Sequence, residues 1–266
     1  MNIRRTLIGR IALDKALLTI FLFISSYSFA QTSQRWNEIR IDGGINQIKE
    51  KNIHPKTHDG FMVGVNYGHG NMKRNIYSIE TGLSFSMMKT TYESSLASAN
   101  VRFFFDYHYL FPVNGNRTFS YFLGPEIGLN YSVSYYPNWD ESHLYWANYL
   151  GTGFRNELVC QVHPRHQLIL DLSIPVLFVL SRPDADRKYK MDDFSPGKIM
   201  TKIHEQPEVS FWNRSFVMEF TLEHQIKGIN RVIPAFYYSF NYYRLQTKDS
   251  RSFKNVSHQL GVKFYL

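Results

Sequence analysis

The sequence predicts an all-β fold, a closed antiparallel transmembrane β-barrel, with ten strands as the favoured number and eight or twelve as alternatives. Apolar and polar residues alternate along most of the chain, and a period of two is typical of strands whose two faces meet different surroundings. Short and long connections also alternate between these segments. Finally, the 266 residues include 21 Phe, 18 Tyr and 4 Trp, although the chain is polar on average.

The first thirty residues are typical of a secretory signal peptide, which leaves residues 31–266 as a single barrel domain. Residues 1–15 carry four basic residues and one acid, and residues 16–24 form a short apolar run. Small residues then precede an expected cleavage site between Ala30 and Gln31. An uncleaved membrane anchor is the alternative, but the apolar run is shorter than the roughly 20 residues that a spanning helix needs.

Alternation is clearest in four segments. In residues 101–111 every odd position is apolar or aromatic, whereas Arg102, Asp106 and His108 lie on the other face. Residues 167–178 are expected to turn one apolar face outward, formed by Leu168, Leu170, Leu172, Ile174, Val176 and Phe178. Residues 214–223 and 235–243 repeat the pattern. Weaker versions occur at residues 36–46, 60–68, 76–88, 118–135, 145–161 and 254–266.

The connections favour a barrel over the rival interpretation, a soluble secreted β-sandwich. Those after the second, fourth, sixth and eighth segments are short, whereas the others are mostly longer, with the longest at residues 182–212. In bacterial membrane barrels short turns face the periplasm and longer loops face outward. Because lipid offers the backbone no hydrogen-bond partners, a spanning sheet must close on itself. Phe and Tyr residues near the strand ends suit the two membrane interfaces.

Composition excludes several other classes of protein. The single cysteine, Cys160, rules out a disulfide framework within the chain and any cysteine-rich metal site. The basic residues are dispersed, so no nucleic-acid partner is expected. After the signal segment no stretch approaches 18 uninterrupted apolar residues, so no transmembrane helix is expected. Neither a cofactor nor a bound metal is predicted.

The last segment, NVSHQLGVKFYL, places Val256, Leu260, Val262, Phe264 and Leu266 on one face. Together with the signal peptide and the alternating strands, it resembles a bacterial outer-membrane β-barrel protein. The Tyr- and Phe-rich style is similar to the PorT-like barrel families of Bacteroidota. This resemblance implies an outer-membrane location, contact with membrane lipid and lipopolysaccharide, and recognition of the C-terminal strand by the outer-membrane assembly machinery. It also implies an envelope protein as a further partner.

Strand parity directs fourteen ionisable residues into the predicted lumen, with acids in excess. A barrel of this size has room for side chains or a thin column of water, and charges there must pair or stay hydrated. A plugging network of ion pairs is therefore favoured over a narrow cation-preferring channel or a catalytic site. The fourteen residues are Glu38, Arg40, Asp42, Glu80, Arg102, Asp106, His108, Glu126, Arg155, Glu157, Asp171, Glu219, Glu223 and Lys263.

Small residues also fall on the inward face, and they have two interpretations. They relieve crowding where strands curve, or they leave a cavity along one side of the barrel that a hydrocarbon or glycan chain could enter. The residues are Gly64, Gly82, Ser84, Gly124, Gly128, Gly151 and Gly153.

Catalytic and metal-binding candidates are weak. Asp106 and His108 share one face and would form an orienting pair if a serine such as Ser120 or Ser134 lay beside them; an inward salt bridge is the favoured interpretation. The pair His163 and His166 flanks a tight turn and lacks a carboxylate, so a solvated turn is favoured over a metal site. Residues 184–193 carry four carboxylates but lack the spacing of a calcium loop. Ser257 and His258 are adjacent and would face opposite sides of a strand.

The sequence favours a non-enzymatic outer-membrane protein that acts as a structural, assembly or surface-binding component with a largely plugged lumen. A narrow channel for ions or small solutes and an envelope enzyme acting on lipid A are the alternatives. The long loop 182–212 is the expected contact surface because it combines charged and aromatic residues. The residues expected to make the contact are Arg182, Arg187, Lys188, Lys190, Phe194, Phe211 and Trp212.

Overall fold

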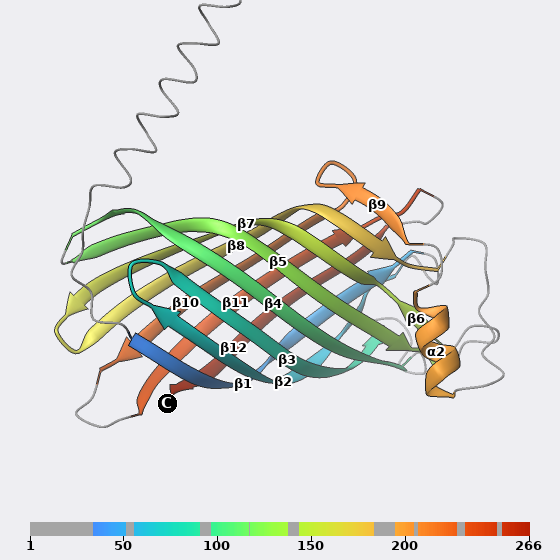
Figure 1. The fold of residues 1–266 in the computed structure, drawn as a ribbon. Coiled ribbons are helices and arrows are strands. Elements are labelled where there is room, and N and C mark those ends of the chain that lie inside the picture. Colours follow the sequence, from blue (N-terminus) through green and yellow to red (C-terminus); the bar gives the residue numbers. More distant parts are fainter. Residues whose placement is uncertain are drawn as a thin grey trace, which may run out of the picture.

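The computed structural model shows one antiparallel sheet that closes into a barrel (Figure 1). It describes residues 34–51, 56–90, 97–116, 118–137, 144–183, 195–204, 207–227, 232–248 and 252–266. The expected signal peptide and its cleavage site lie outside these residues, as do Arg187, Lys188, Lys190 and Phe194. No described helix is long and apolar enough to cross a membrane.

Ten long strands form the wall, which confirms the predicted fold class and strand number. Each predicted segment coincides with one of these strands, although most of the strands extend a few residues further. Their bounds are β1 Gln34–Glu50, β2 His58–Met72, β3 Ile76–Thr90, β4 Ala97–Gly115, β5 Phe119–Tyr135, β7 Asn148–His163, β8 His166–Ser181, β10 Phe216–Ile226, β11 Ile233–Leu245 and β12 Phe253–Tyr265.

Two pairings of strands distant in sequence close the barrel. The first and last strands run side by side from Glu38 opposite Tyr265 to Glu50 opposite Phe253. Strands β8 and β10 pair from Glu219 opposite Ser173 onward, across the insertion that separates them in sequence. Every long strand therefore has two neighbours, and no long edge is left with open backbone groups.

The barrel has two different ends. One end is called here the turn end. It carries the start of β1, the end of β12 and the connections β2–β3, β4–β5, β7–β8 and β10–β11 (Figure 1). The other, the loop end, carries three short elements that sequence periodicity did not separate. These are β6 Leu144–Trp146, which pairs with β5, the helix α2 Pro196–Lys202, and β9 Glu208–Phe211, which pairs with β8.

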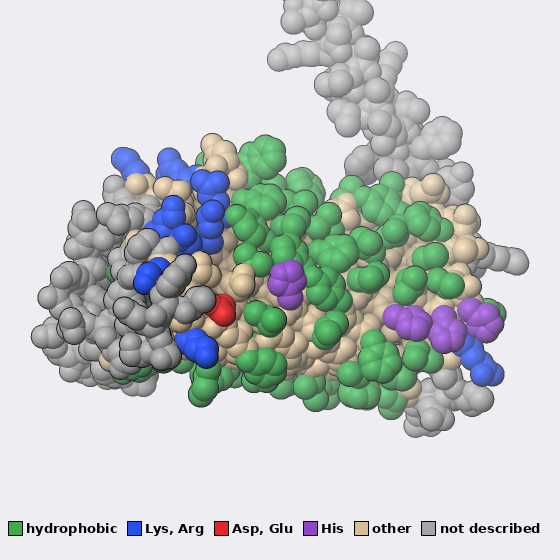
Figure 2. Space-filling model, turned by 180° about the vertical axis from the view of Figure 1, so that it is seen from behind, with side chains coloured by type: hydrophobic (Ala, Val, Ile, Leu, Met, Phe, Trp, Pro, Cys, Tyr) green, Lys and Arg blue, Asp and Glu red, His purple; other side chains and the backbone are tan. Residues whose placement is uncertain are grey.

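The outer wall is apolar and the interior contains many polar groups, unlike a water-soluble barrel, whose outer wall is polar. Ile45, Phe61 and Met87 expose 56%, 64% and 69% of their surfaces. Figure 2 shows hydrophobic side chains covering the visible wall in a broad band. Buried groups include many carboxylates, amides and hydroxyls from the opposite strand faces. The period of two in the sequence thus separates an apolar outside from a polar inside.

The loop half of the interior is filled by an apolar cluster, called here the apolar plug. Its members come from strands all around the barrel and from the residue before β7, and all are at most 5% exposed. Because residues from opposite walls pack together, the plug occupies the lumen itself. It consists of Ile48, Met88, Ala147, Tyr149, Phe178, Leu180, Val217, Tyr243, Leu245 and Phe253.

The prediction that Phe178 faces outward is wrong, because a bulge reverses the parity of β8. In the pairing with β7, Thr152 lies opposite Leu177 and Gly153 lies opposite Pro175, so one residue of β8 is extra. The carbonyl of that residue, Val176, accepts a hydrogen bond from the backbone of Trp212 at 3.1 Å. Beyond the bulge, Phe178 points inward and is fully buried.

Candidate functional site

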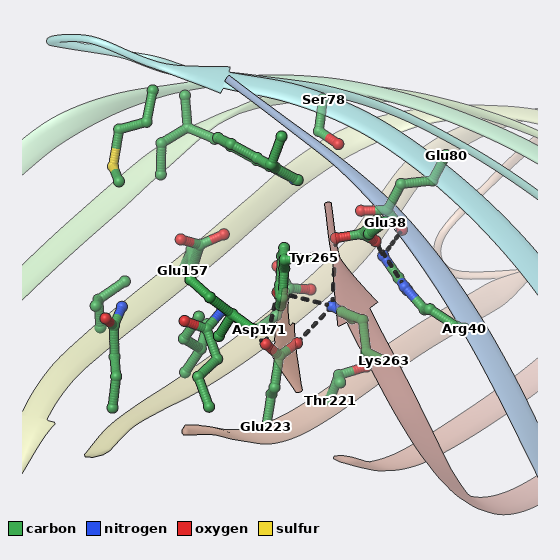
Figure 3. Close-up of a pocket in the computed structure, with 18 of the residues that line it drawn as sticks. Glu38, Arg40, Ser78, Glu80, Glu157, Asp171, Thr221, Glu223, Lys263 and Tyr265 are labelled. Atoms are coloured by element: carbon green, nitrogen blue, oxygen red, sulfur yellow. Dashed lines mark hydrogen bonds and ion pairs between the residues drawn. The ribbon is translucent and has the colours of Figure 1, made fainter. Parts of the chain in front are cut away.

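The turn half of the lumen contains a cavity of about 150 Å³, and a smaller one of about 60 Å³ lies deeper. Met72, Ile76 and Ile233, at strand ends beside the turns, line the larger cavity, so it begins at the turn end. Charged side chains converge on it from several strands (Figure 3). The lumen is therefore polar near the turn end and apolar near the loop end.

Four charged residues line both cavities and form the partition between them: Arg40, Glu80, Arg155 and Asp171. The guanidinium of Arg40 lies 2.7 Å from a carboxylate oxygen of Glu80. Glu80 in turn accepts from Arg155 at 3.3 Å, and Arg155 Nε donates to Asp171 at 2.7 Å. The partition joins β1, β3, β7 and β8, so it ties together parts of the wall that are not neighbours.

Three more charged residues, Glu38, Lys263 and Glu223, extend the partition from Arg40. Arg40 pairs with Glu38, whose second oxygen lies 3.7 Å from the Lys263 ammonium. Lys263 also pairs with Glu223, which accepts a hydrogen bond from the Tyr265 hydroxyl at 2.5 Å. Acids and bases therefore alternate along seven residues, and each buried base has a carboxylate on both sides. Such pairing is what makes charges tolerable in a poorly hydrated interior.

A second bridge crosses the lumen between the partition and the apolar plug. Arg102 on β4 lies 3.2 Å from a carboxylate oxygen of Glu219 on β10 and donates to the hydroxyl of Tyr243 on β11. Its guanidinium also lies over the Tyr243 ring, 4.7 Å from the centroid. In the ten-strand order β4 and β11 are five strands apart in either direction, so this bridge joins opposite walls.

Two other inward acids, Asp42 and Glu126, accept hydrogen bonds from uncharged side chains. Asp42 accepts from Asn66 at 2.9 Å and from the Tyr237 hydroxyl at 2.8 Å. Glu126 accepts from the Ser173 hydroxyl at 2.5 Å. Charge-assisted hydrogen bonds of this kind partly replace the water that each carboxylate has lost.

The fourteen ionisable residues that parity directs inward lie in the interior of the barrel. All except Glu126 line one of the two cavities, and Glu126 is buried beside Ser173. Glu157 lies directly opposite Asp171 in the β7–β8 register and has no hydrogen bond or ion pair within the described part of the chain. Sequence reasoning missed the tyrosine hydroxyls of Tyr237, Tyr243 and Tyr265, which share the inward parity of their strands.

The inward glycines do not create an open side chamber. A Cβ atom built on Gly64 would collide with the Asp42 carboxylate, and one on Gly128 would collide with that of Asp106. At Gly124 the obstruction is the backbone carbonyl of Tyr109 on the neighbouring strand. Of the two interpretations, the structure supports relief of crowding, because neighbouring groups already fill the space.

Asp106 and His108 do not assemble into a catalytic site with the expected serines. His108 is buried, and its Nδ1 atom has no hydrogen-bond partner among the described residues. Ser134 pairs with Asn100 near the loop end, whereas Ser120 pairs with Gly115 at the turn end. The serine opposite His108 is Ser78, and its hydroxyl donates to a backbone carbonyl at 3.4 Å.

At the loop end, the expectation that Arg182 belongs to an accessible contact surface is wrong. Its guanidinium is fully buried, donates to both carboxylate oxygens of Glu50 at 2.9 and 2.8 Å, and donates to the Leu245 carbonyl at 2.7 Å. Phe211 and Trp212, in contrast, are 57% and 64% exposed, and Val209 beside them is 57% exposed. These three side chains form an exposed apolar strip along β9 and the residue after it.

Comparisons with known proteins support the barrel fold. No family model matches the chain, and no curated protein matches it in sequence. Among solved structures, it is similar to the outer membrane protease OmpT from Escherichia coli, with a TM-score of 0.50 and 6% identity over 91% of this chain and 100% of that one. The two chains share a fold.

Two further structures are less similar. The transport unit of the autotransporter AIDA-I from Escherichia coli has a TM-score of 0.39 and 10% identity, covering 93% of this chain and 96% of that one. The beta domain of the Bordetella autotransporter BrkA has a TM-score of 0.40 and 7% identity, covering 87% and 98%. At 6% identity, the similarity to OmpT concerns the fold alone.

Proposed function

We propose that the protein is an integral outer-membrane β-barrel whose lumen is closed, and that it acts as a structural, assembly or surface-binding component. The observation that carries this proposal is the bridge of Arg102, Glu219 and Tyr243 between opposite walls. The charged partition lies on its turn side and the apolar plug on its loop side. A solute would have to displace all three layers in order to pass.

The membrane location is supported by the distribution of polarity. A wall that exposes Ile, Val, Leu and Phe side chains would be costly in water, at roughly 25 cal/mol per Å² of apolar surface. In a bilayer the same wall is solvated by lipid, while the closed sheet satisfies the backbone. A cleaved signal peptide ending at Ala30 would supply the export that such a location needs.

The partners follow from this placement. β12 forms one side of the closing seam with β1, so its alternating residues are available to the outer-membrane assembly machinery before the barrel closes. The resemblance to PorT-like barrels of Bacteroidota supports a structural or assembly role with an envelope protein partner. The apolar residues Val209, Phe211 and Trp212 beside the loop-end rim suit contact with the outer-leaflet lipid, including lipopolysaccharide.

Conductance in a planar lipid bilayer tests the closed lumen. The purified protein is expected to insert without steady ohmic conductance. The double variant Phe178→Ala with Tyr243→Ala removes two aromatic rings from the apolar plug and one partner of Arg102. It should therefore show channel openings that are larger or last longer than those of the unaltered protein. Val179→Ala, on the outer face of the same strand, is the matched control. Steady conductance from the unaltered protein would contradict the proposal and favour a narrow channel.

A further inference from the structure

Three histidines from separate places in the sequence meet on the outer face at the turn end. His163 ends β7, His166 begins β8, and His224 lies two residues before the end of β10. The rings of His163 and His166 are 5.7 Å apart, and those of His166 and His224 are 5.2 Å apart and nearly parallel. Figure 2 shows histidine side chains gathered at one end of the wall. The sequence suggested only the first two, because the third comes from a strand almost sixty residues away.

The nitrogen atoms of the second pair face each other at a distance suited to metal ligation. His166 Nδ1 lies 3.1 Å from His224 Nε2. Imidazole nitrogens bind Zn²⁺ at about 2.0–2.1 Å, and at such bond lengths two adjacent ligands of one ion lie roughly 2.8–3.4 Å apart, for ligand–metal–ligand angles between about 90° and 110°. We propose that His166 and His224 form a two-nitrogen chelate for a divalent transition-metal ion, with Cu²⁺ preferred.

The chemistry of the pair supports this assignment. In the hydrogen bond between the two rings, one facing nitrogen donates its proton and the other accepts it. When a metal ion binds, that proton moves to the other nitrogen of its own ring, so that both facing nitrogens present a lone pair to the ion. Within the described part of the chain no group of three or more His, Cys, Asp or Glu side chains is arranged to hold a metal. Water would therefore complete the coordination sphere. Imidazole ligands and the general order of metal affinity both favour Cu²⁺ over Ni²⁺ and Zn²⁺.

Hydrogen bonds at this end of the barrel already engage Lys227 and one nitrogen of His163. The Lys227 ammonium donates to Gln161 at 3.0 Å, and partial burial lowers the pKa of Lys227. Arg165 contributes its backbone carbonyl to the Lys227 amide. The backbone of Arg165 also donates to His163 Nδ1 at 3.4 Å, which engages that nitrogen. The two facing nitrogens of His166 and His224 are thus the donors best placed for an ion.

Copper binding by the full chain, purified in detergent without an affinity tag, tests the proposal. Calorimetry is expected to show one Cu²⁺ per chain, and electron paramagnetic resonance should show two imidazole nitrogens. His166→Gln and His224→Gln should each weaken binding by at least about tenfold, because even the loss of a group that only orients a metal ligand costs about 10–100-fold. His69→Gln is the matched control, since that ring lies near the same end and bonds to Asn37.

Two results would overturn the proposal: no stoichiometric Cu²⁺ binding by the unaltered protein, or unchanged binding in both single variants. The resonance measurement on protein with ¹⁵N-labelled histidine needs no variant, so it remains decisive if a substitution impairs folding. Lowering the pH should release the ion as protons compete for the nitrogens. The copper test and the conductance test can fail separately, because the chelate lies on the outer face whereas the proposed function depends on the lumen.

Discussion

The buried ion pair of Arg182 and Glu50 gives the sharpest quantitative test of the structure. It connects the loop ends of β8 and β1 and, through the Leu245 carbonyl, of β11. The perturbation is Arg182→Met, which keeps most of the apolar length of the side chain but removes the guanidinium. The sequence pattern placed Arg182 on an accessible loop, so the same variant distinguishes a surface role from a structural one.

The expected loss follows from the contacts. The Arg182 side chain is 0% exposed and that of Glu50 is 3% exposed, and three hydrogen bonds of 2.7–2.9 Å depend on the guanidinium. Removing one partner of a buried ion pair typically costs about 3–5 kcal/mol, because the remaining charge keeps its desolvation penalty. We therefore expect Arg182→Met to lower the free energy of unfolding by that amount.

Urea unfolding in lipid vesicles, followed by tryptophan fluorescence, measures this change. The double variant Arg182→Met with Glu50→Met removes both charges, so it should recover much of the loss. Arg214→Met is the matched control, because its ion pair with Glu208 is largely exposed and should contribute less than about 1 kcal/mol. A loss below about 1 kcal/mol in Arg182→Met would refute the buried pair and return this residue to the set of contact candidates.

Substitutions at three further positions probe the interior by the same unfolding measurement. Phe178→Ala should cost about 3–5 kcal/mol, because the ring is fully buried in the apolar plug; a loss below 1 kcal/mol would place the ring outside. Gly128→Val should cost about 1–3 kcal/mol, since the new side chain must displace Asp106, and Gly128→Ala should cost less. Glu157→Gln should stabilise the barrel by up to about 1 kcal/mol at neutral pH, because an amide avoids the cost of placing an ionisable acid in the poorly hydrated lumen opposite Asp171. That gain should vanish in acid, where both carboxyl groups are protonated, and a gain independent of pH would contradict the electrostatic reason.

The fold was largely predictable because a membrane barrel imposes the same rule on every strand. Each strand meets lipid on one side and the lumen on the other, so the period of two persists through nearly the whole chain. The exceptions are local. The bulge at Val176 reverses parity for Phe178, and nothing in the alternation of neighbouring residues signals an unpaired position in advance. The short strand β9 follows from a pairing with β8 that only the folded chain brings about.

The interior was predictable as a set of residues and less so as an arrangement. Parity identifies Arg102, Glu219 and Tyr243 as inward, but it does not determine that they meet across the lumen. That contact depends on the number of strands and their stagger, which fix which residues share a level of the barrel. The buried position of Arg182 has a similar cause, because its partner Glu50 lies 132 residues earlier in the chain.

The sequence by itself determined the class of fold, the direction of the wall residues outside the bulge in β8, and the polarity of the outer surface. These properties are local, since each depends on whether a residue and its neighbours face lipid or lumen. The tertiary structure decided that the apolar plug fills the loop half of the lumen, that the partition links seven charges in alternation, and that His166 meets His224. Those features depend on distances between strands far apart in sequence, and barrel closure sets these distances.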